Sequence, residues 1–208
     1  MLDRRATALL RPALERIARL LVRAGVGPNQ VTLAGFLVGT LAAGLIVAGM
    51  NQLALAAILA SRLCDGLDGA VARVGGTVSD RGGFLDIALD FVFYASIPLA
   101  FALADPQPNA LGAAVLLAAF IGTGSSFLAF AALAAKRGLH STDYPHKSFY
   151  FLGGLTESGE TLLCFCAMCL WSAWFAWFAY GFAVLCLLTT GTRIWWGWRA
   201  LGEPDPRH

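Results

Sequence analysis

The 208-residue sequence predicts an all-α polytopic membrane protein, with six transmembrane helices preceded by an N-terminal amphipathic interfacial helix. Two observations lead to this fold class. Hydrophobic residues make up 58% of the chain and charged residues only 13%, whereas a soluble domain carries about 25% charged residues. The apolar residues also fall in repeated runs of the length that a bilayer-crossing helix needs, about 20 residues. The composition therefore excludes a soluble domain, a disordered chain and a disulfide scaffold.

Residues 1–27 form the first expected element, an amphipathic juxtamembrane helix. Leucine, isoleucine and alanine recur there at helical spacing, with arginines between them. Such a helix either lies in the lipid headgroup plane or packs on the protein. It does not read as a signal peptide, because arginine interrupts its apolar residues throughout.

Residues 28–200 form the expected six-helix membrane domain, and residues 201–208 a C-terminal tail. Glycine, proline and asparagine separate the apolar runs, for example at Gly27-Pro28-Asn29 and Asp105-Pro106. The connections are short, so the chemistry must be built from the spans and their ends. The expected spans are 30–50, 52–72, 83–104, 109–135, 149–171 and 174–198.

The basic residues predict the orientation of these spans. Lysine and arginine gather before the first span, after the second and the fourth, and at the C-terminus, whereas the other three connections contain none. Cytoplasmic loops collect such residues. We therefore expect both termini and the charged connections on the cytoplasmic side. The net charge of +2 is too small to indicate a nucleic-acid partner.

Six acidic residues lie inside the apolar spans. A carboxylate at the centre of a lipid-facing helix costs at least about 3 kcal/mol, so such groups normally face a polar cavity and have partners. This placement predicts a function for them. The six are Asp65, Asp68, Asp86, Asp90, Glu157 and Glu160.

The spacing of the four aspartates indicates a metal site. Asp65 and Asp68 are three residues apart and Asp86 and Asp90 four, so each pair projects from one helix face. A short loop joins the two helices, which brings all four carboxylates near one membrane surface. Their mutual repulsion favours divalent cations, and the hard oxygen ligands favour Mg²⁺ or Mn²⁺, with two ions bridged by carboxylates. The alternative is a structural network of carboxylates and arginine.

Glycines accompany the aspartates. Gly66, Gly69, Gly82 and Gly83 remove side chains from the nearby helix faces, which would allow a nucleotide to lie against the backbone. Arg73 follows one helical turn after Gly69. It could hold a pyrophosphate or extend to the lipid headgroups.

These residues carry a resemblance to a known family. The pattern Asp65-x-x-Asp68-Gly69-x-x-Ala72-Arg73, eight residues, then Gly82-x-x-x-Asp86-x-x-x-Asp90 resembles the full signature of the CDP-alcohol phosphotransferases, with every spacing intact. The segment from Pro28 to Thr32 is also similar to the family. Further stretches look like its inner-membrane members in enteric bacteria, which implies a bacterial inner-membrane location and, as is common in the family, a homodimer.

The resemblance implies transfer of a substituted phosphate from CDP-diacylglycerol or another CDP-alcohol to a small alcohol, with release of CMP. It implies that Asp65, Asp68 and Asp86 bind two metal ions with help from Asp90, and that Asp90 is the catalytic base. It also implies a CDP site, for which the candidate residues are Asn29, Thr32, Asp65, Gly69, Ala72, Arg73 and Gly82.

The acceptor site is expected on the later spans. A phosphorylated acceptor needs several converging cations, which Lys147 and Arg193 could provide in part, whereas Glu157 could meet an amino group. The candidate acceptor residues are Lys147, Glu157, Glu160 and Arg193. Both glutamates could instead make interhelical hydrogen bonds. Inositol phosphate is disfavoured, because the family members that use it resemble this chain but have basic residues where it has Ser158 and Thr161.

Two alternative functions are compatible with the sequence. A CDP-linked head group could be donated to a lipid alcohol, which reverses the roles of donor and acceptor. A cation transporter would also use intramembrane acids. It would need a polar path across the membrane, but the acids cluster toward one side, and segments 53–59 and 94–103 offer no charged continuation.

Overall fold

The computed structural model describes residues 2–137 and 156–202, with side chains from residue 11 onward. Within these ranges the chain forms helices and no strand, which confirms the all-α prediction. The elements in chain order are α1 (Leu2–Arg23), α2 (Pro28–Val47), α3 (Asn51–Gly75), α4 (Asp80–Ala104), α5 (Pro106–Lys136), α7 (Ser158–Leu170), the short 3₁₀ helix η1 (Ser172–Trp174) and α8 (Phe175–Gly202).

Four helical segments are long and apolar enough to cross a membrane: α2, α4, α5, and η1 together with α8. Large apolar side chains on them face outward, such as Leu37, which is 66% exposed, and Ile121, which is 71% exposed. This is the surface of a membrane protein, because a water-soluble chain buries most such side chains. The six-span count stays a prediction. The second expected span is α3, which contains four charged residues, and the first part of the fifth lies outside the described residues.

Local signals explain where the helices around the acids begin and end. Pro28 occupies the first turn of α2, where its missing N–H costs nothing. Gly76 ends α3 in a left-handed conformation with φ +63°, which glycine adopts without strain. Ser79 then caps α4, since its hydroxyl accepts a hydrogen bond from the Gly82 N–H at 3.2 Å. The loop between α3 and α4 is thus only 76–79, and Gly82 and Gly83 belong to the first turn of α4.

Small residues allow the helices to approach closely. A Cβ at Gly35 would lie 2.8 Å from the Cβ of Cys64 on α3, and one at Gly39 would overlap the ring of Phe93 on α4. Gly122 and Gly124 likewise make room for side chains of α8 and α4. The glycines therefore set the spacing of the bundle, because the backbones approach where side chains are absent.

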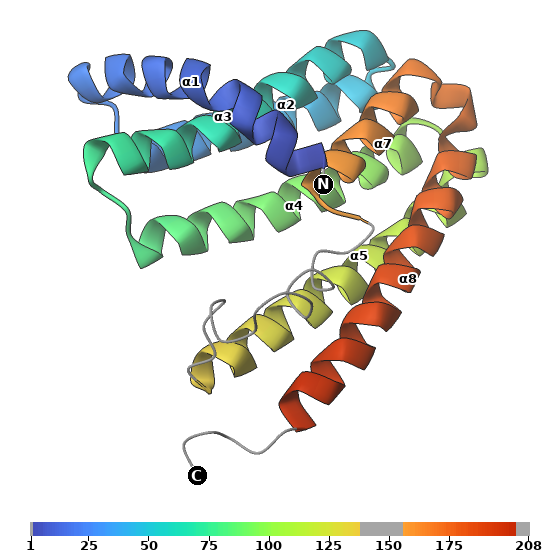
Figure 1. The fold of residues 1–208 in the computed structure, drawn as a ribbon. Coiled ribbons are helices and arrows are strands. Elements are labelled where there is room, and N and C mark those ends of the chain that lie inside the picture. The colour runs from blue at the N-terminus through green and yellow to red at the C-terminus, as the bar shows by residue number, and fades with distance from the viewer. Residues whose placement is uncertain (1, 138–155, 203–208) are drawn as a thin grey trace.

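The helices form two groups (Figure 1). α2, α3 and α4 pack together, while α5 and α8 run side by side, and α4 connects the groups by packing on both α2 and α5. The main core lies between them and contains the fully buried rings of Phe93, Phe165 and Phe175.

The N-terminal helix α1 crosses α3 (Figure 1). Ala18 of α1 is fully buried against Ala70 and Val71 of α3. Ile17 and Leu20 of the same helix are exposed. The helix therefore packs on the protein with one apolar face and leaves further apolar side chains uncovered.

Candidate active site

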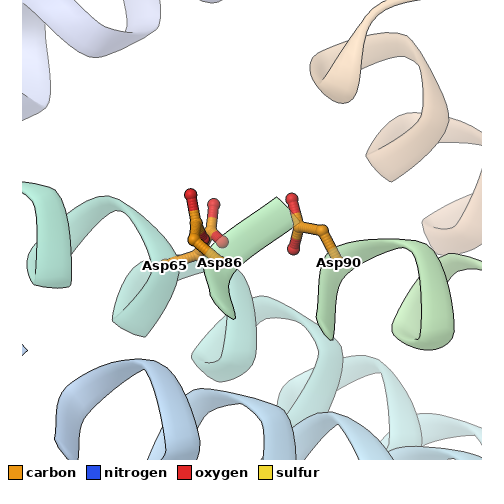
Figure 2. A group of neighbouring side chains, drawn as sticks. All are labelled: Asp65, Asp86 and Asp90. Atoms are coloured by element: carbon orange, nitrogen blue, oxygen red, sulfur yellow. The ribbon is translucent and has the colours of Figure 1, made fainter. Parts of the chain in front are cut away.

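Three of the four aspartates converge. One carboxylate oxygen from each of Asp65, Asp86 and Asp90 lies within 4.8 Å of the other two. Figure 2 shows Asp86 and Asp90 pointing to the same side of α4, with Asp65 of α3 beside Asp86. The helical spacing produces this arrangement, because residues four apart on α4 share a face and α3 returns antiparallel to it.

The fourth aspartate, Asp68, lines the same small cavity with a different partner. The hydroxyl of Thr32, on α2, donates a hydrogen bond of 2.6 Å to its Oδ2. Asp68 is nearly buried, with 6% exposure, so a charge-assisted bond of this kind orients it firmly. Asp68 also lines the larger pocket described below, which places it between the two cavities.

Arg62 is the cation at the acid pocket, which we define by the residues Asp65, Asp68, Asp86 and Asp90. Its Nη1 lies 2.7 Å from Oδ1 of Asp90 and 3.5 Å from Oδ1 of Asp65. Arg62 precedes Asp65 by one turn on α3, and Asp90 follows Asp86 by one turn on α4. The pair therefore lies at the deep end of the pocket, away from the loop that joins the helices.

The donor set fits a divalent metal. One guanidinium against four carboxylates leaves the pocket strongly negative when the acids are ionised, and such charges repel strongly in a medium of low dielectric constant. Oxygen ligands on opposite sides of Mg²⁺ lie about 4.2 Å apart, so the 4.8 Å grouping of three carboxylate oxygens is close to coordination distance. Asp65, Asp86 and Asp90 could hold such an ion, and Asp68 lines the same cavity.

A larger pocket adjoins the acids on the side of the α3–α4 loop, with a volume of about 340 Å³. It joins the predicted CDP residues of three helices: Asn29 and Thr32 of α2, Gly69, Ala72 and Arg73 of α3, and Gly82 of α4. Asp65, also predicted to contact CDP, lines the adjoining acid cavity instead. The rest of the lining consists of Pro28, Asp68, Thr77, Val78, Ser79, Gly83 and Asp86.

The glycines of this region divide between two roles. A Cβ at Gly69 would lie 3.2 Å from Nη1 of Arg73, so the guanidinium lies across the bare backbone there. A Cβ at Gly82 would lie 3.3 Å from the side chain of Asn29. Gly66 is different: its neighbour is Leu14 of α1, at 3.5 Å. Its small size therefore accommodates α1 and not a nucleotide, in contrast to the expectation from sequence.

A second cavity, of about 450 Å³, lies on the other side of α4. Phe91 and Tyr94, which follow Asp90 on α4, line it together with Thr123 of α5, Thr156, and Thr161 of α7. Its walls are mainly apolar, with threonine hydroxyls at intervals. It therefore offers space on the side of α4 opposite the nucleotide-sized pocket.

Three of the predicted acceptor residues, Glu157, Glu160 and Arg193, lie in the described part of the chain. Arg193 of α8 donates a hydrogen bond of 3.0 Å to the carbonyl oxygen of Thr123, which places it beside the second cavity. Glu160 accepts a hydrogen bond from the backbone N–H of Glu157 at 3.1 Å, which caps α7. This is a local structural role for Glu160. Lys147 lies outside the described residues.

The sequence offered Arg62 as one of few cations near the four carboxylates, within the alternative of a structural network, but it did not predict which carboxylate Arg62 contacts. A signal was present, because an arginine inside an apolar span and three residues before Asp65 shares a helix face with that acid. Its contact with Asp90 on α4 depends on the relative rotation of two helices, which the sequence alone does not determine.

The chain belongs to the CDP-alcohol phosphatidyltransferase family, whose profile matches residues 26–190. It is 54% identical over 201 residues to the inner membrane protein YnjF of Escherichia coli (strain K12), and the match covers 97% of each chain. It is also 46% identical over 91 residues to the archaetidylinositol phosphate synthase of Pyrococcus horikoshii, across 43% of this chain and 48% of that protein. The resemblance inferred from the motif is thereby confirmed, and the protein is a transferase of this family.

Solved structures show the same fold. The phosphatidylinositol phosphate synthase PgsA1 of Mycobacterium tuberculosis with CDP-DAG bound superposes with a TM-score of 0.66 at 21% identity, covering 89% of this chain and 93% of that one. The same synthase in complex with manganese and citrate gives a TM-score of 0.64, again at 21% identity, and covers 89% of this chain and 88% of that one.

Proposed function

We propose that this protein transfers a phosphatidyl group from CDP-diacylglycerol to an alcohol and releases CMP, in phospholipid biosynthesis at a bacterial inner membrane. The single observation that carries the proposal is the convergence of Asp65, Asp86 and Asp90 beside a pocket that unites the other predicted CDP residues. Family membership and the CDP-DAG in the similarly folded synthase support this donor.

The proposed topology has six spans with both termini and the acid pocket at the cytoplasmic side. α3 has 25 residues and therefore a length of about 37 Å, which exceeds the hydrocarbon thickness of a bilayer, about 30 Å. The hydrogen bonds of Asp68 with Thr32 on α2 and of Arg62 with Asp90 on α4 support a placement of these two charged side chains away from lipid. α1 would lie at the membrane surface with Ile17 and Leu20 toward lipid.

The proposed cofactors are two Mg²⁺ or Mn²⁺ ions held by Asp65, Asp68, Asp86 and Asp90. Such ions neutralise a diphosphate and stabilise the departing CMP when they are bound. The four carboxylates provide hard oxygen ligands, and Thr32 fixes the orientation of Asp68. Manganese in the similarly folded synthase supports this assignment.

The remaining steps fall to the side chains of the protein. Arg73 and the bare backbone at Gly69 hold the nucleotide beside the acids. Asp90 removes the proton from the acceptor hydroxyl, whose oxygen then forms a bond to the phosphorus of the phosphatidyl group. The bond from that phosphorus to the CMP oxygen breaks, and CMP leaves with the electron pair.

The acceptor would enter from the second cavity, because Phe91 and Tyr94, which follow Asp90 on α4, line that cavity. Arg193 stands beside it and could meet a polar group of the alcohol, while Glu157 at the start of α7 and Lys147 remain proposed contacts. The chain is proposed to act as a homodimer, as is common in the family.

The direct test is metal-dependent release of CMP. Purified protein in lipid nanodiscs receives CDP-diacylglycerol, Mn²⁺ and one of a series of alcohols, and CMP and new lipids are measured by mass spectrometry. The proposal expects CMP and a new phospholipid in equal amounts with at least one alcohol, and neither product in the presence of EDTA. Turnover with CDP-linked head groups and diacylglycerol, but not with CDP-diacylglycerol, would instead support the reversed roles of donor and acceptor.

A further inference from the structure

A contribution to the stability of the fold does not by itself explain the position of Arg62. Its side chain is 12% exposed and spans α3 and α4 through the bond to Asp90. Replacing a buried ion pair by well-packed apolar residues is often neutral or stabilising, because two charges must be removed from water. An ion pair at this depth therefore calls for a functional explanation.

The guanidinium also has an incomplete set of partners. Nη1 binds Asp90 and Nη2 lies 3.4 Å from the hydroxyl of Ser61. Its Nε is buried and has no hydrogen-bond acceptor among the residues that the structure describes. A buried donor without an acceptor lowers the stability of the fold. Arg62 therefore keeps this orientation although one of its donors is unsatisfied.

Aromatic rings hold the guanidinium in this orientation. Its central carbon lies 4.1 Å from the centroid of the Phe93 ring and 5.4 Å from that of Tyr94, which are cation–π distances. Phe93 is itself fully buried and sits where Gly39 has no side chain. A rigid chain of contacts therefore runs from α2 through Phe93 to Arg62.

The only described side-chain hydrogen bond to Asp90 is the one from Arg62 to Oδ1. That contact engages one oxygen of a carboxylate that belongs to the convergent group with Asp65 and Asp86. A base works only when its carboxylate lies within hydrogen-bond reach of the proton that it removes. Arg62 contacts the acids at the deep end of the pocket and is not among the residues that line the nucleotide-sized pocket.

From this geometry we propose that Arg62 is the positioning residue for Asp90: it clamps Oδ1 from the floor of the acid pocket, so that the other oxygen meets the acceptor hydroxyl. This inference rests on the proposed function. Arg62 acts through Asp90 and does not touch the donor, so its loss should lower turnover and leave donor binding intact.

The test uses Arg62→Met, which keeps an apolar stem over Phe93 and removes the clamp. We expect kcat for CMP release to fall about 10- to 100-fold, the size of a hydrogen bond to a charged group, while the KM for CDP-diacylglycerol stays within about twofold. Arg62→Lys keeps the charge and should recover part of the loss. Arg199→Met is the matched control, because Arg199 stacks on Trp195 and is exposed, and it should leave kcat unchanged.

Two further measurements separate positioning from a structural role. The shift in thermal unfolding temperature caused by CMP with Mn²⁺ should persist in Arg62→Met, because the nucleotide pocket is unaltered. Arg62→Met should also add little to the loss already caused by Asp90→Asn, since two residues that act through one step are not additive. If Arg62→Met does not fold, Arg62→Gln poses the same question with a neutral side chain that still has an N–H donor.

The inference is overturned if Arg62→Met retains the wild-type kcat, if it abolishes the CMP-dependent shift, or if it lowers the residual rate of Asp90→Asn by the same factor as that of the wild type. These outcomes are distinct from failure of the proposed function. In that case the wild-type protein itself releases no CMP from CDP-diacylglycerol with any alcohol.

Discussion

The nucleotide side and the acceptor side of α4 differ in how they are assembled. On the nucleotide side, residues of α3 and α4 that are close in sequence meet residues of α2 in one pocket, because a loop of four residues joins α3 to α4 and glycines let α2 approach. On the acceptor side, the lining comes from α4, α5, α7 and α8 and from Thr156 before α7, and the polar groups are mostly threonines. In the proposed function the first region binds the CDP-linked donor and the second admits the alcohol.

The largest effect should come from Asp90→Asn, which tests whether the acids between the two regions do the chemistry. Asparagine keeps the shape of the side chain but cannot take a proton, and a general base contributes about 10²- to 10⁴-fold. We expect CMP release to fall by that factor, with the unfolding temperature little changed. Normal turnover by a folded Asp90→Asn protein would show that Asp90 is not the general base.

A smaller loss should follow from Thr32→Val, which tests the precision of the nucleotide side. The variant deletes the 2.6 Å bond to Asp68, and a hydrogen bond to a charged group contributes about 1.5–3 kcal/mol. We expect kcat/KM for CDP-diacylglycerol to fall at least about tenfold. Thr40→Val is the control on the same helix, because the Thr40 hydroxyl is exposed and bonds only to the carbonyl oxygen of Phe36 among the described residues. Equal effects of the two variants would contradict a specific role for Thr32.

Gly69→Ala should affect the donor more modestly. The added methyl would lie 3.2 Å from Nη1 of Arg73 and displace the end of that side chain. A steric conflict of this kind costs on the order of 1 kcal/mol, which is about fivefold in the KM for the donor. Gly44→Ala provides the control, since a Cβ there meets no atom within 4 Å among the described residues. An unchanged KM in Gly69→Ala would show that Arg73 does not hold the nucleotide.

The smallest effect is expected on the acceptor side, from Glu160. Glu160→Gln keeps an oxygen that can accept from the Glu157 N–H, so both activity and stability should stay near those of the wild type. Glu160→Ala removes that cap and should lower the free energy of unfolding by about 1 kcal/mol. Thermal unfolding and CMP release are measured on both variants. A large loss of turnover in Glu160→Gln with normal stability would instead make Glu160 an acceptor contact.

The same contrast explains what the sequence could predict. Every end of the described spans lies within four residues of its expected position, apart from the fifth span, whose start is outside the described residues. The pairing of Asp68 with Thr32 was not predicted, whereas the convergence of Asp65, Asp86 and Asp90 followed from helical spacing and a short loop. Both are local properties, so the sequence sufficed.

The rest depended on how helices rotate against one another. Gly66 faces α1 and not the nucleotide pocket, because α1 packs on the face of α3 that carries it. The pairing of Arg62 with Asp90 depends on the register of α3 and α4. Arg193 reaches Thr123, 70 residues away in sequence, and such distant contacts leave no periodic signal in one sequence.

The position of bound manganese tests the proposed function most directly. Crystals of the protein with Mn²⁺ and CDP-diacylglycerol, measured at a wavelength where manganese scatters anomalously, should show two peaks enclosed by Asp65, Asp68, Asp86 and Asp90, next to the diphosphate. A map with the nucleotide lipid in place and no anomalous peak among these carboxylates would contradict it.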